Sequence, residues 1–243
     1  MKLYDAHSHL HFPENADSFS AFLQSGVTAC DCSAGISDMD DLREAAAACG
    51  GRLLASYGIH PWFVPSGARR FPADAVMEFL EGADAVGEIG LDRKCGSDYA
   101  SQKSFFEFQL GAASDLGLPA VIHCRGAWGD LLEILGKCAP ARGVLIHAAK
   151  CPPDALKTLS EMGAYFSFGM RELGSMKGLA CAASAPADRI LAESDGGADP
   201  EDLERVVGVL AELRNESAEN MSKILEDNFL RLFSGGRRQV FQD

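Results

Sequence analysis

Short apolar runs alternate with amphipathic stretches along the whole chain. Each run has four to eight residues, is rich in Val, Ile, Leu or Phe, and is bounded by Gly, Pro or a polar cluster, which is typical of buried strands. The predicted strands cover residues 2–6, 26–32, 53–59, 85–91, 119–123, 143–147, 164–168 and 189–195. The stretches between them repeat their apolar residues at helical spacing and predict helices over residues 16–24, 38–49, 73–80, 101–116, 129–137, 153–162, 200–213 and 217–233.

This alternation predicts an α/β fold with parallel strands, because parallel neighbours need crossover connections and helices supply them. For 243 residues and eight strands the natural closure is a (β/α)8 TIM barrel, allowing for an irregular strand or two. An open doubly wound sheet is the alternative, but no Gly-x-Gly-x-x-Gly follows the first predicted strand. No linker rich in Pro, Gly or Ser divides the chain, so residues 1–243 are expected to form a single domain.

Composition narrows the function. The formal net charge is −13, and 47% of the residues are hydrophobic. This balance excludes a disordered chain and argues against a protein that binds duplex DNA through a broad basic face. It leaves room for a small pocket in which bound cations receive one phosphate, because a metal ion can reverse the local field.

The sequence shows no recognisable targeting signal. It begins without the basic and apolar regions of a signal peptide, and no run reaches the roughly 18 apolar residues of a membrane span. The eight cysteines are interpreted as free thiols of a reducing compartment, because the lone pair Cys30 and Cys32 has no second pair to complete a zinc site. We therefore expect a cytoplasmic protein with no membrane partner and no obligate protein partner.

The histidines gather where the predicted strands end. Five of the six, together with two acidic residues, lie at or near these C-terminal ends: His7, His9, His60, His123 and His147, with Glu88 and Asp195. A barrel builds its active site from the C-terminal ends of its strands and the loops that follow them. A lone buried histidine is most often a core residue with a satisfied hydrogen bond, but this concentration favours a metal site. His11 is left over and is assigned to a loop.

His7 and His9 are separated by one residue on a strand, so both rings leave the same face. Their Cα atoms would lie about 6.6 Å apart, near enough for both imidazoles to reach one cation at about 2.1 Å. Four imidazoles and two carboxylates are too many ligands for one tetrahedral zinc, and they suit two cations about 3.5–4 Å apart. Glu88, in a mid-barrel strand, is the expected bridge between them.

In this order the motifs closely resemble those of the TatD-type deoxyribonucleases, metal-dependent hydrolases of the amidohydrolase superfamily. The resemblance covers essentially the whole chain. Its motifs are Asp5-Ala6-His7-Ser8-His9-Leu10, Gly58-Ile59-His60-Pro61, Gly87-Glu88-Ile89-Gly90-Leu91-Asp92, Gln102 with Phe105, Gln109 and Leu110, Leu118-Pro119-Ala120-Val121-Ile122-His123-Cys124-Arg125, Leu191-Ala192-Glu193-Ser194-Asp195, and the tail Asn228-Phe229-Leu230-Arg231-Leu232-Phe233.

The resemblance implies two divalent metal ions, with Zn, Mn or Mg as candidates. It implies that His7, His9 and Asp195 bind one ion, that His123 and His147 bind the second, and that Glu88 bridges the two. Asp195 is also the implied general base. The implied catalytic residues are Asp195 and the bridging Glu88.

The resemblance further implies that His60 and Arg125 contact the scissile phosphate. For Arg125 a structural ion pair is the alternative, and for His60 a turn before Pro61. The sequence departs from the family beside His147, where Ala148-Ala149-Lys150 replaces small polar residues. It also lacks the usual Pro-rich loop after Asp195, and residues 193–227 hold 11 acidic against three basic side chains.

We therefore expect a divalent-metal-dependent phosphodiesterase or deoxyribonuclease acting on DNA ends or short oligonucleotides. The alternative keeps the metals but cleaves a C–N or C–O bond in a small metabolite, which the acidic charge and the missing loop favour. A metal-stabilised scaffold is disfavoured because all six ligands are present. A histidinol-phosphatase-type phosphoesterase is disfavoured because the chain lacks the expected Asp-x-His after the last strand.

Overall fold

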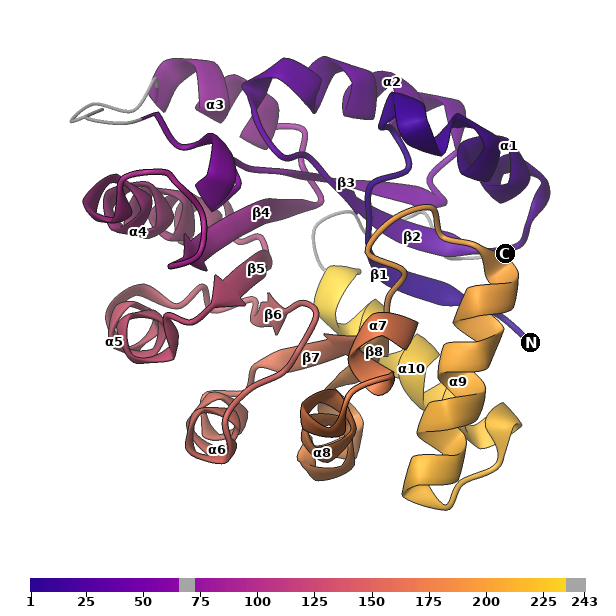
Figure 1. Cartoon of the computed structure of the whole chain (residues 1–243). Coiled ribbons are helices and arrows are strands. Elements are labelled where there is room, and N and C mark those ends of the chain that lie inside the picture. The colour runs from indigo at the N-terminus through magenta and orange to yellow at the C-terminus, as the bar shows by residue number, and fades with distance from the viewer. Residues whose placement is uncertain (66–72, 235–243) are drawn as a thin grey trace.

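The computed structural model describes residues 1–65 and 73–234 and shows eight parallel strands in a ring, with helices outside it (Figure 1). Each strand pairs with the next one along the chain, and the ring is nearly closed between the last strand and the first. The strands are β1 (Tyr4–Ser8), β2 (Thr28–Cys32), β3 (Leu53–Tyr57), β4 (Ala85–Asp92), β5 (Ala120–Arg125), β6 (Val144–Ile146), β7 (Tyr165–Phe168) and β8 (Ile190–Ala192). The predicted (β/α)8 barrel is confirmed.

Helices follow the strands in the predicted order. They are α1 (Ala16–Gln24), α2 (Met39–Ala48), α3 (Ala73–Leu80), α4 (Tyr99–Leu116), α5 (Trp128–Cys138), α6 (Pro153–Glu161), α7 (Met170–Leu173), α8 (Met176–Ser184), α9 (Pro200–Arg214) and α10 (Ala218–Phe233). Short 3-10 helices cover Pro13–Asn15, Ile36–Asp38, Pro61–Phe63 and Ala187–Arg189. In the part of the chain that the structure describes, no helix combines the length and the hydropathy needed to cross a membrane.

Helices α7 and α8 were not predicted. The sequence of α8 is rich in Gly and Ala, so it presents no stripe of large apolar side chains at helical spacing. A local signal was nevertheless present, because Ser175 is the N-cap of α8 and its side chain accepts a hydrogen bond from Gly178 N.

Small and medium apolar side chains fill the barrel, and all are at most 6% exposed: Ala6, Cys30, Cys32, Leu54, Ala85, Val121, Leu145, Tyr165 and Leu191. Phe229, Leu232 and Phe233 of α10 join this cluster, and α10 passes behind the strands in Figure 1. Helix α10 therefore covers one end of the barrel, which leaves the opposite end, where the strands terminate, open for a site.

The first strand and the loop after the last strand meet beside that open end. Asp195 N, just after β8, donates a hydrogen bond of 3.1 Å to His7 O on β1. The buried carboxylate of Asp5 supports the same junction, since its Oδ1 accepts hydrogen bonds from His7 N and Ser194 N at 3.2 and 3.0 Å. Residues from the first and the last strand are thereby held against one another.

Candidate metal centre

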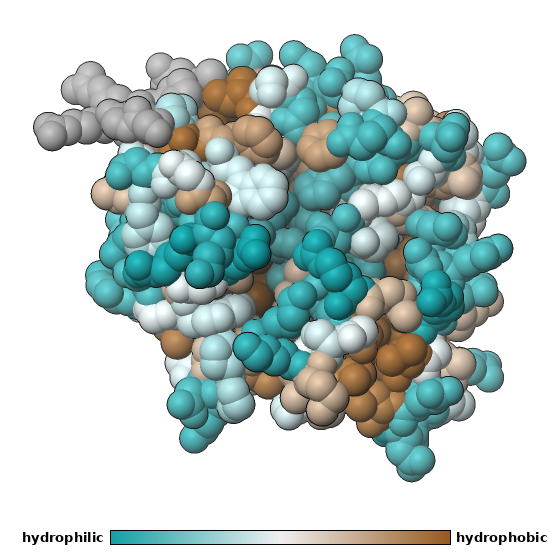
Figure 2. Space-filling model, viewed as in Figure 1, coloured by the Kyte–Doolittle hydropathy of each residue, from teal (hydrophilic) through white to brown (hydrophobic). Residues whose placement is uncertain are grey.

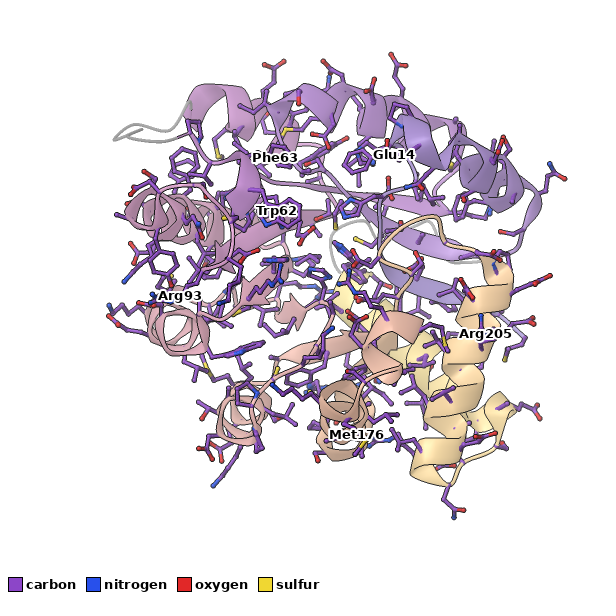
Figure 3. The ribbon with its side chains drawn as sticks, viewed as in Figure 1. Glu14, Trp62, Phe63, Arg93, Met176 and Arg205 are labelled. Atoms are coloured by element: carbon purple, nitrogen blue, oxygen red, sulfur yellow. The ribbon has the colours of Figure 1, made fainter. Side chains whose placement is uncertain are left out.

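An open cleft of about 650 Å³ lies at the C-terminal ends of the strands. Hydrophilic residues surround the middle of this face (Figure 2), and side-chain nitrogen atoms crowd the centre of the strand ring (Figure 3). All eight predicted site residues lie here. His7 is buried beneath the cleft, and the other seven line it: His9, His60, Glu88, His123, Arg125, His147 and Asp195.

The carboxylate of Glu88 is the geometric centre of the site. Its Oε2 lies 3.4 Å from His7 Nε2 and 3.5 Å from His9 Nε2. Its Oε1 faces the other side, 2.8 Å from His147 Nε2 and 3.0 Å from His123 Nδ1. The two oxygens of one buried side chain are therefore divided between two pairs of imidazoles.

Three groups of side chains offer ligand atoms that all lie within 4.8 Å of one another: His7–His9–Asp195, His7–Glu88–His147 and His60–Glu88–His123. The first two groups bring together five of the six predicted ligands. The third adds His60, whose Nε2 lies 3.3 Å from Glu88 Oε1. His60, predicted as a substrate contact, thus stands beside the ligand set.

The hydrogen bonds of the rings separate ligands from donors. His9 Nδ1 lies 2.8 Å from the carbonyl oxygen of Cys32, which can only accept, so Nδ1 carries the proton and Nε2 keeps a free lone pair toward the site. His123 Nε2 lies 3.3 Å from Asp92 Oδ2, which leaves Nδ1 as the free nitrogen.

His60 is oriented in the opposite sense. Its Nδ1 accepts a hydrogen bond of 3.1 Å from Trp62 N, so in the neutral ring the proton is on Nε2, the atom that faces the site. Burial lowers the pKa of His60, which favours this neutral form. His60 therefore presents an N–H donor to the cleft rather than a lone pair.

Asp195 divides its two oxygens between the ligand cluster and a cation. Oδ1 lies 3.5 Å from His7 Nε2, and Oδ2 lies 2.9 Å from Arg171 Nη2. The backbone of Asp195 is in the left-handed region, with φ +52°, which a residue other than glycine adopts rarely. Ala148, directly after His147, has φ +45°. Non-glycine residues with such backbone angles cluster at functional sites.

The charges of the site are mutually dependent. Burial opposes the ionisation of Glu88, but the surrounding imidazoles, His147 first among them, hold its pKa well below the ordinary value. Burial likewise opposes a charge on His123, but the neighbouring carboxylates of Asp92 and Glu88 raise the pKa of its imidazole. The carboxylates of Glu88 and Asp92 are therefore anionic at neutral pH.

The polar atoms at the centre fit metal ions. His7 Nε2 and Glu88 Oε1 are buried and have no hydrogen-bond partner among the described residues, although imidazole and carboxylate atoms surround both. Such a buried polar atom is costly unless something satisfies it. Imidazole nitrogens and carboxylate oxygens are donors that divalent transition metals accept, so the residues present suit cations between them.

Close packing of β4 against β5 helps to position the predicted ligand His123. Gly90 on β4 has φ +143°, and a Cβ at this position would lie 2.0 Å from the carbonyl oxygen of His123. Only glycine lets β4 approach β5 this closely. The sequence marked Gly90 as part of a motif, and the structure shows the contact that requires it.

Sequence reasoning missed several residues around the cleft. His11 is not an idle loop residue, because its buried ring lies between Asp31 and Asp38. Lys150 and Arg171 line the cleft with Arg125. Asp92, behind His123, could have been suspected from its place at the end of β4. The partners of Lys150 and Arg171, by contrast, depend on tertiary structure.

Comparison with known proteins gives a consistent result. The sequence profile of the family described as TatD related DNase matches residues 4–234. The metal-dependent hydrolase YabD of Bacillus subtilis, itself uncharacterized, is 29% identical over 164 residues, which cover 61% of this chain but only 64% of that protein. The 3′-5′ ssDNA/RNA exonuclease TatD of Pantoea vagans is 27% identical over 205 residues, 75% of this chain and 78% of that one. The crystal structure of YJJV, a TatD homologue from Escherichia coli K12, superposes with a TM-score of 0.81 and 25% identity, covering 96% of this chain and 98% of that chain.

Proposed function

The chain belongs to the family of TatD-related DNases, and from this we propose that it is a hydrolase that uses two divalent metal ions to cleave phosphodiester bonds at nucleic-acid ends or in short oligonucleotides. The relative from Pantoea vagans is named as an exonuclease of single-stranded DNA and RNA, which supports this substrate class.

One observation carries the proposal of two ions. The two oxygens of Glu88 face different pairs of imidazoles, His7 with His9 and His123 with His147. A carboxylate shared in this way is typical of a bridge between paired cations. Asp195 is the third proposed ligand beside His7 and His9. Zn, Mn and Mg are the candidate ions, and imidazole-rich ligation favours Zn or Mn.

Divalent cations held by these residues would supply a nucleophile at neutral pH and stabilise the charge that develops on the phosphoryl group. The side chains do the rest. Asp195 accepts the proton of the attacking water, and Arg171 orients its carboxylate through Oδ2. His60 Nε2–H donates a hydrogen bond to a phosphate oxygen, and Arg125, exposed at the rim, neutralises its charge.

Two exposed aromatic side chains support a substrate with unstacked bases. Trp62 and Phe63 line the cleft and are 55% and 58% exposed. In Figure 3, Trp62 lies nearer the centre of the ring than Phe63. Exposed aromatic faces beside a backbone-binding cleft stack nucleobases of single strands. Stacking of this kind is unavailable to bases inside a duplex.

The acidic charge of the chain does not oppose this substrate at the cleft. Among the residues that the structure describes, the acidic segment 193–227 contributes only Asp195 to the cleft lining. The same lining contains three cations, Arg125, Lys150 and Arg171.

Two wider inferences accompany the proposal. The single sheet that spans β1 to β8 supports one domain over residues 1–243. The eight cysteines, all free, support a reducing compartment such as the cytoplasm.

The test is a substrate screen of the purified protein after exhaustive chelation and after addition of Mn²⁺, Zn²⁺ or Mg²⁺. The substrates are single-stranded DNA, RNA, duplex DNA, a chromogenic phosphodiester and small amides. We expect no hydrolysis after chelation and release of nucleotides from single-stranded ends once metal is restored. Full activity with metal absence verified by elemental analysis would refute the mechanism, and turnover of amides alone would establish the alternative C–N hydrolase.

A further inference from the structure

A pair of cations lines the side of the cleft formed by the loops after β6 and β7. Lys150 follows β6, and Arg171 lies in α7 directly after β7. Their side chains are 37% and 66% exposed. Neither residue belongs to the predicted ligand set, and Lys150 stands where the sequence departs from the family pattern.

A buried carboxylate holds both cations in place. Glu172 is fully buried, and its Oε1 lies 3.0 Å from Lys150 Nζ and 3.1 Å from Arg171 Nε. Since both contacts share one oxygen, the two cationic groups are neighbours. The buried negative charge of Glu172 thus fixes two long side chains that would otherwise be mobile in solvent.

The same pair adjoins the proposed metal centre. Arg171 Nη2 contacts Asp195 Oδ2 at 2.9 Å, so one guanidinium spans from Asp195 to Glu172. Guanidinium has five N–H donors and ammonium three, so these contacts leave several donors for a ligand in the cleft. A planar guanidinium beside an ammonium is well suited to the oxygens of a phosphate.

We propose that Lys150 and Arg171, positioned by Glu172, form a subsite for a second phosphate, the one next to the scissile phosphodiester. This proposal rests on the proposed function and adds a selectivity to it: substrates with two neighbouring phosphates are favoured over an isolated diester. A nucleotide chain supplies that second phosphate internally, and a terminal phosphate supplies it in a dinucleotide.

The experiment compares three dinucleotides in the Mn²⁺-loaded protein: dTpdT without a terminal phosphate, with a 5′-phosphate and with a 3′-phosphate. We expect one terminal phosphate to raise kcat/KM by about tenfold or more, as for hydrogen bonds between charged groups. Lys150→Gln should remove most of this gain. Lys177→Gln, an exposed lysine outside the cleft lining, is the matched control and should retain it.

Salt dependence separates a phosphate contact from a loss of structure. If Lys150 neutralises a phosphate, Lys150→Gln should reduce the slope of log kcat/KM against log salt by about 0.7 for the phosphorylated dinucleotide. A merely structural change would lower the activity without changing that slope. Glu172→Gln should reduce the gain although its side chain is too deeply buried to touch substrate.

A binding measurement keeps this proposal distinct from the proposed function. Thymidine 3′,5′-bisphosphate should bind the Mn²⁺-loaded protein about tenfold more tightly than thymidine 5′-monophosphate, and Lys150→Gln should abolish the difference. If no diester is cleaved but this difference is found, the phosphodiesterase proposal fails and the subsite stands. Equal binding of the two nucleotides, or a gain that survives in Lys150→Gln, would overturn the subsite.

Discussion

His11 provides a quantitative test of how the loop after β1 is held. Its ring, 1% exposed, lies between two carboxylates, with Nδ1 2.7 Å from Asp31 Oδ2 and Nε2 3.0 Å from Asp38 Oδ2. Both ring nitrogens face acceptors, so both carry protons and the ring is an imidazolium. The clamp ties the loop that contains His9 to the segment after β2.

The expected magnitude follows from the pKa. Burial opposes the charge, but the hydrogen bonds to Asp31 and Asp38 raise the pKa of His11 from 6.5 to about 9. Because the pKa is higher in the folded state, the stabilisation is complete below about pH 6.5 and is lost as the pH rises to about 9. The shift corresponds to about 3 kcal/mol of unfolding free energy.

Urea unfolding of the chelated wild type and of His11→Asn, across this pH range, isolates the effect. The variant lacks the titrating group, so the difference in unfolding free energy should shrink by about 3 kcal/mol between about pH 6.5 and about pH 9. The absolute destabilisation of the variant is not the test. A difference that stays constant or grows with pH would refute the assignment of a charged His11.

Three further outcomes are expected. Glu88→Gln should lower metal content below one ion per chain and reduce kcat/KM by at least about 100-fold, since Glu88 faces both proposed ion positions. Elemental analysis and kinetics would show this, with exposed Glu133→Gln as the silent control. Gly90→Ala should destabilise the fold by about 2 kcal/mol or more, because the added Cβ would meet the backbone of β5. Gly111→Ala in α4, where a Cβ meets nothing within 4 Å, should instead stabilise the fold by up to about 1 kcal/mol. Thermal unfolding of both variants measures the difference. On single-stranded DNA, log KM should depend on log salt with a slope of about 0.7 for each phosphate contacted, and we expect only a few such contacts. A slope that implies six or more phosphate contacts would contradict binding confined to the cleft.

The strands could be predicted because parallel strands inside a barrel are apolar on both faces and read as continuous runs. All eight were found, with errors at the ends. The last predicted strand extended to residue 195, whereas β8 stops at Ala192 and the chain turns through the left-handed conformation of Asp195. Backbone conformation of that kind is set by tertiary hydrogen bonds, here between Asp195 N and His7 O.

The clustering of the predicted ligand residues was recognisable because their chemistry is confined to strand ends, but the supporting charges were not. Lys150 lies in the loop after β6 and Glu172 in α7 after β7, and their contact becomes visible only when β6 and β7 are paired. His11 was undervalued for the same reason, since its partners lie in β2 (Asp31) and after β2 (Asp38). Counting acidic residues over 193–227 says little about the cleft, because that segment lies mainly in α9 and α10 and only Asp195 of it lines the cleft in the described part of the chain.

The junction between β1 and the loop after β8 has a consequence for biosynthesis. His7 and His9 are translated early, whereas Asp195 is translated only after the last strand. The hydrogen bond from Ser194 N to the buried carboxylate of Asp5 also forms only then. A nascent chain therefore cannot complete the first proposed ion position until nearly the whole barrel has been translated. Tight metal uptake should therefore report a finished barrel.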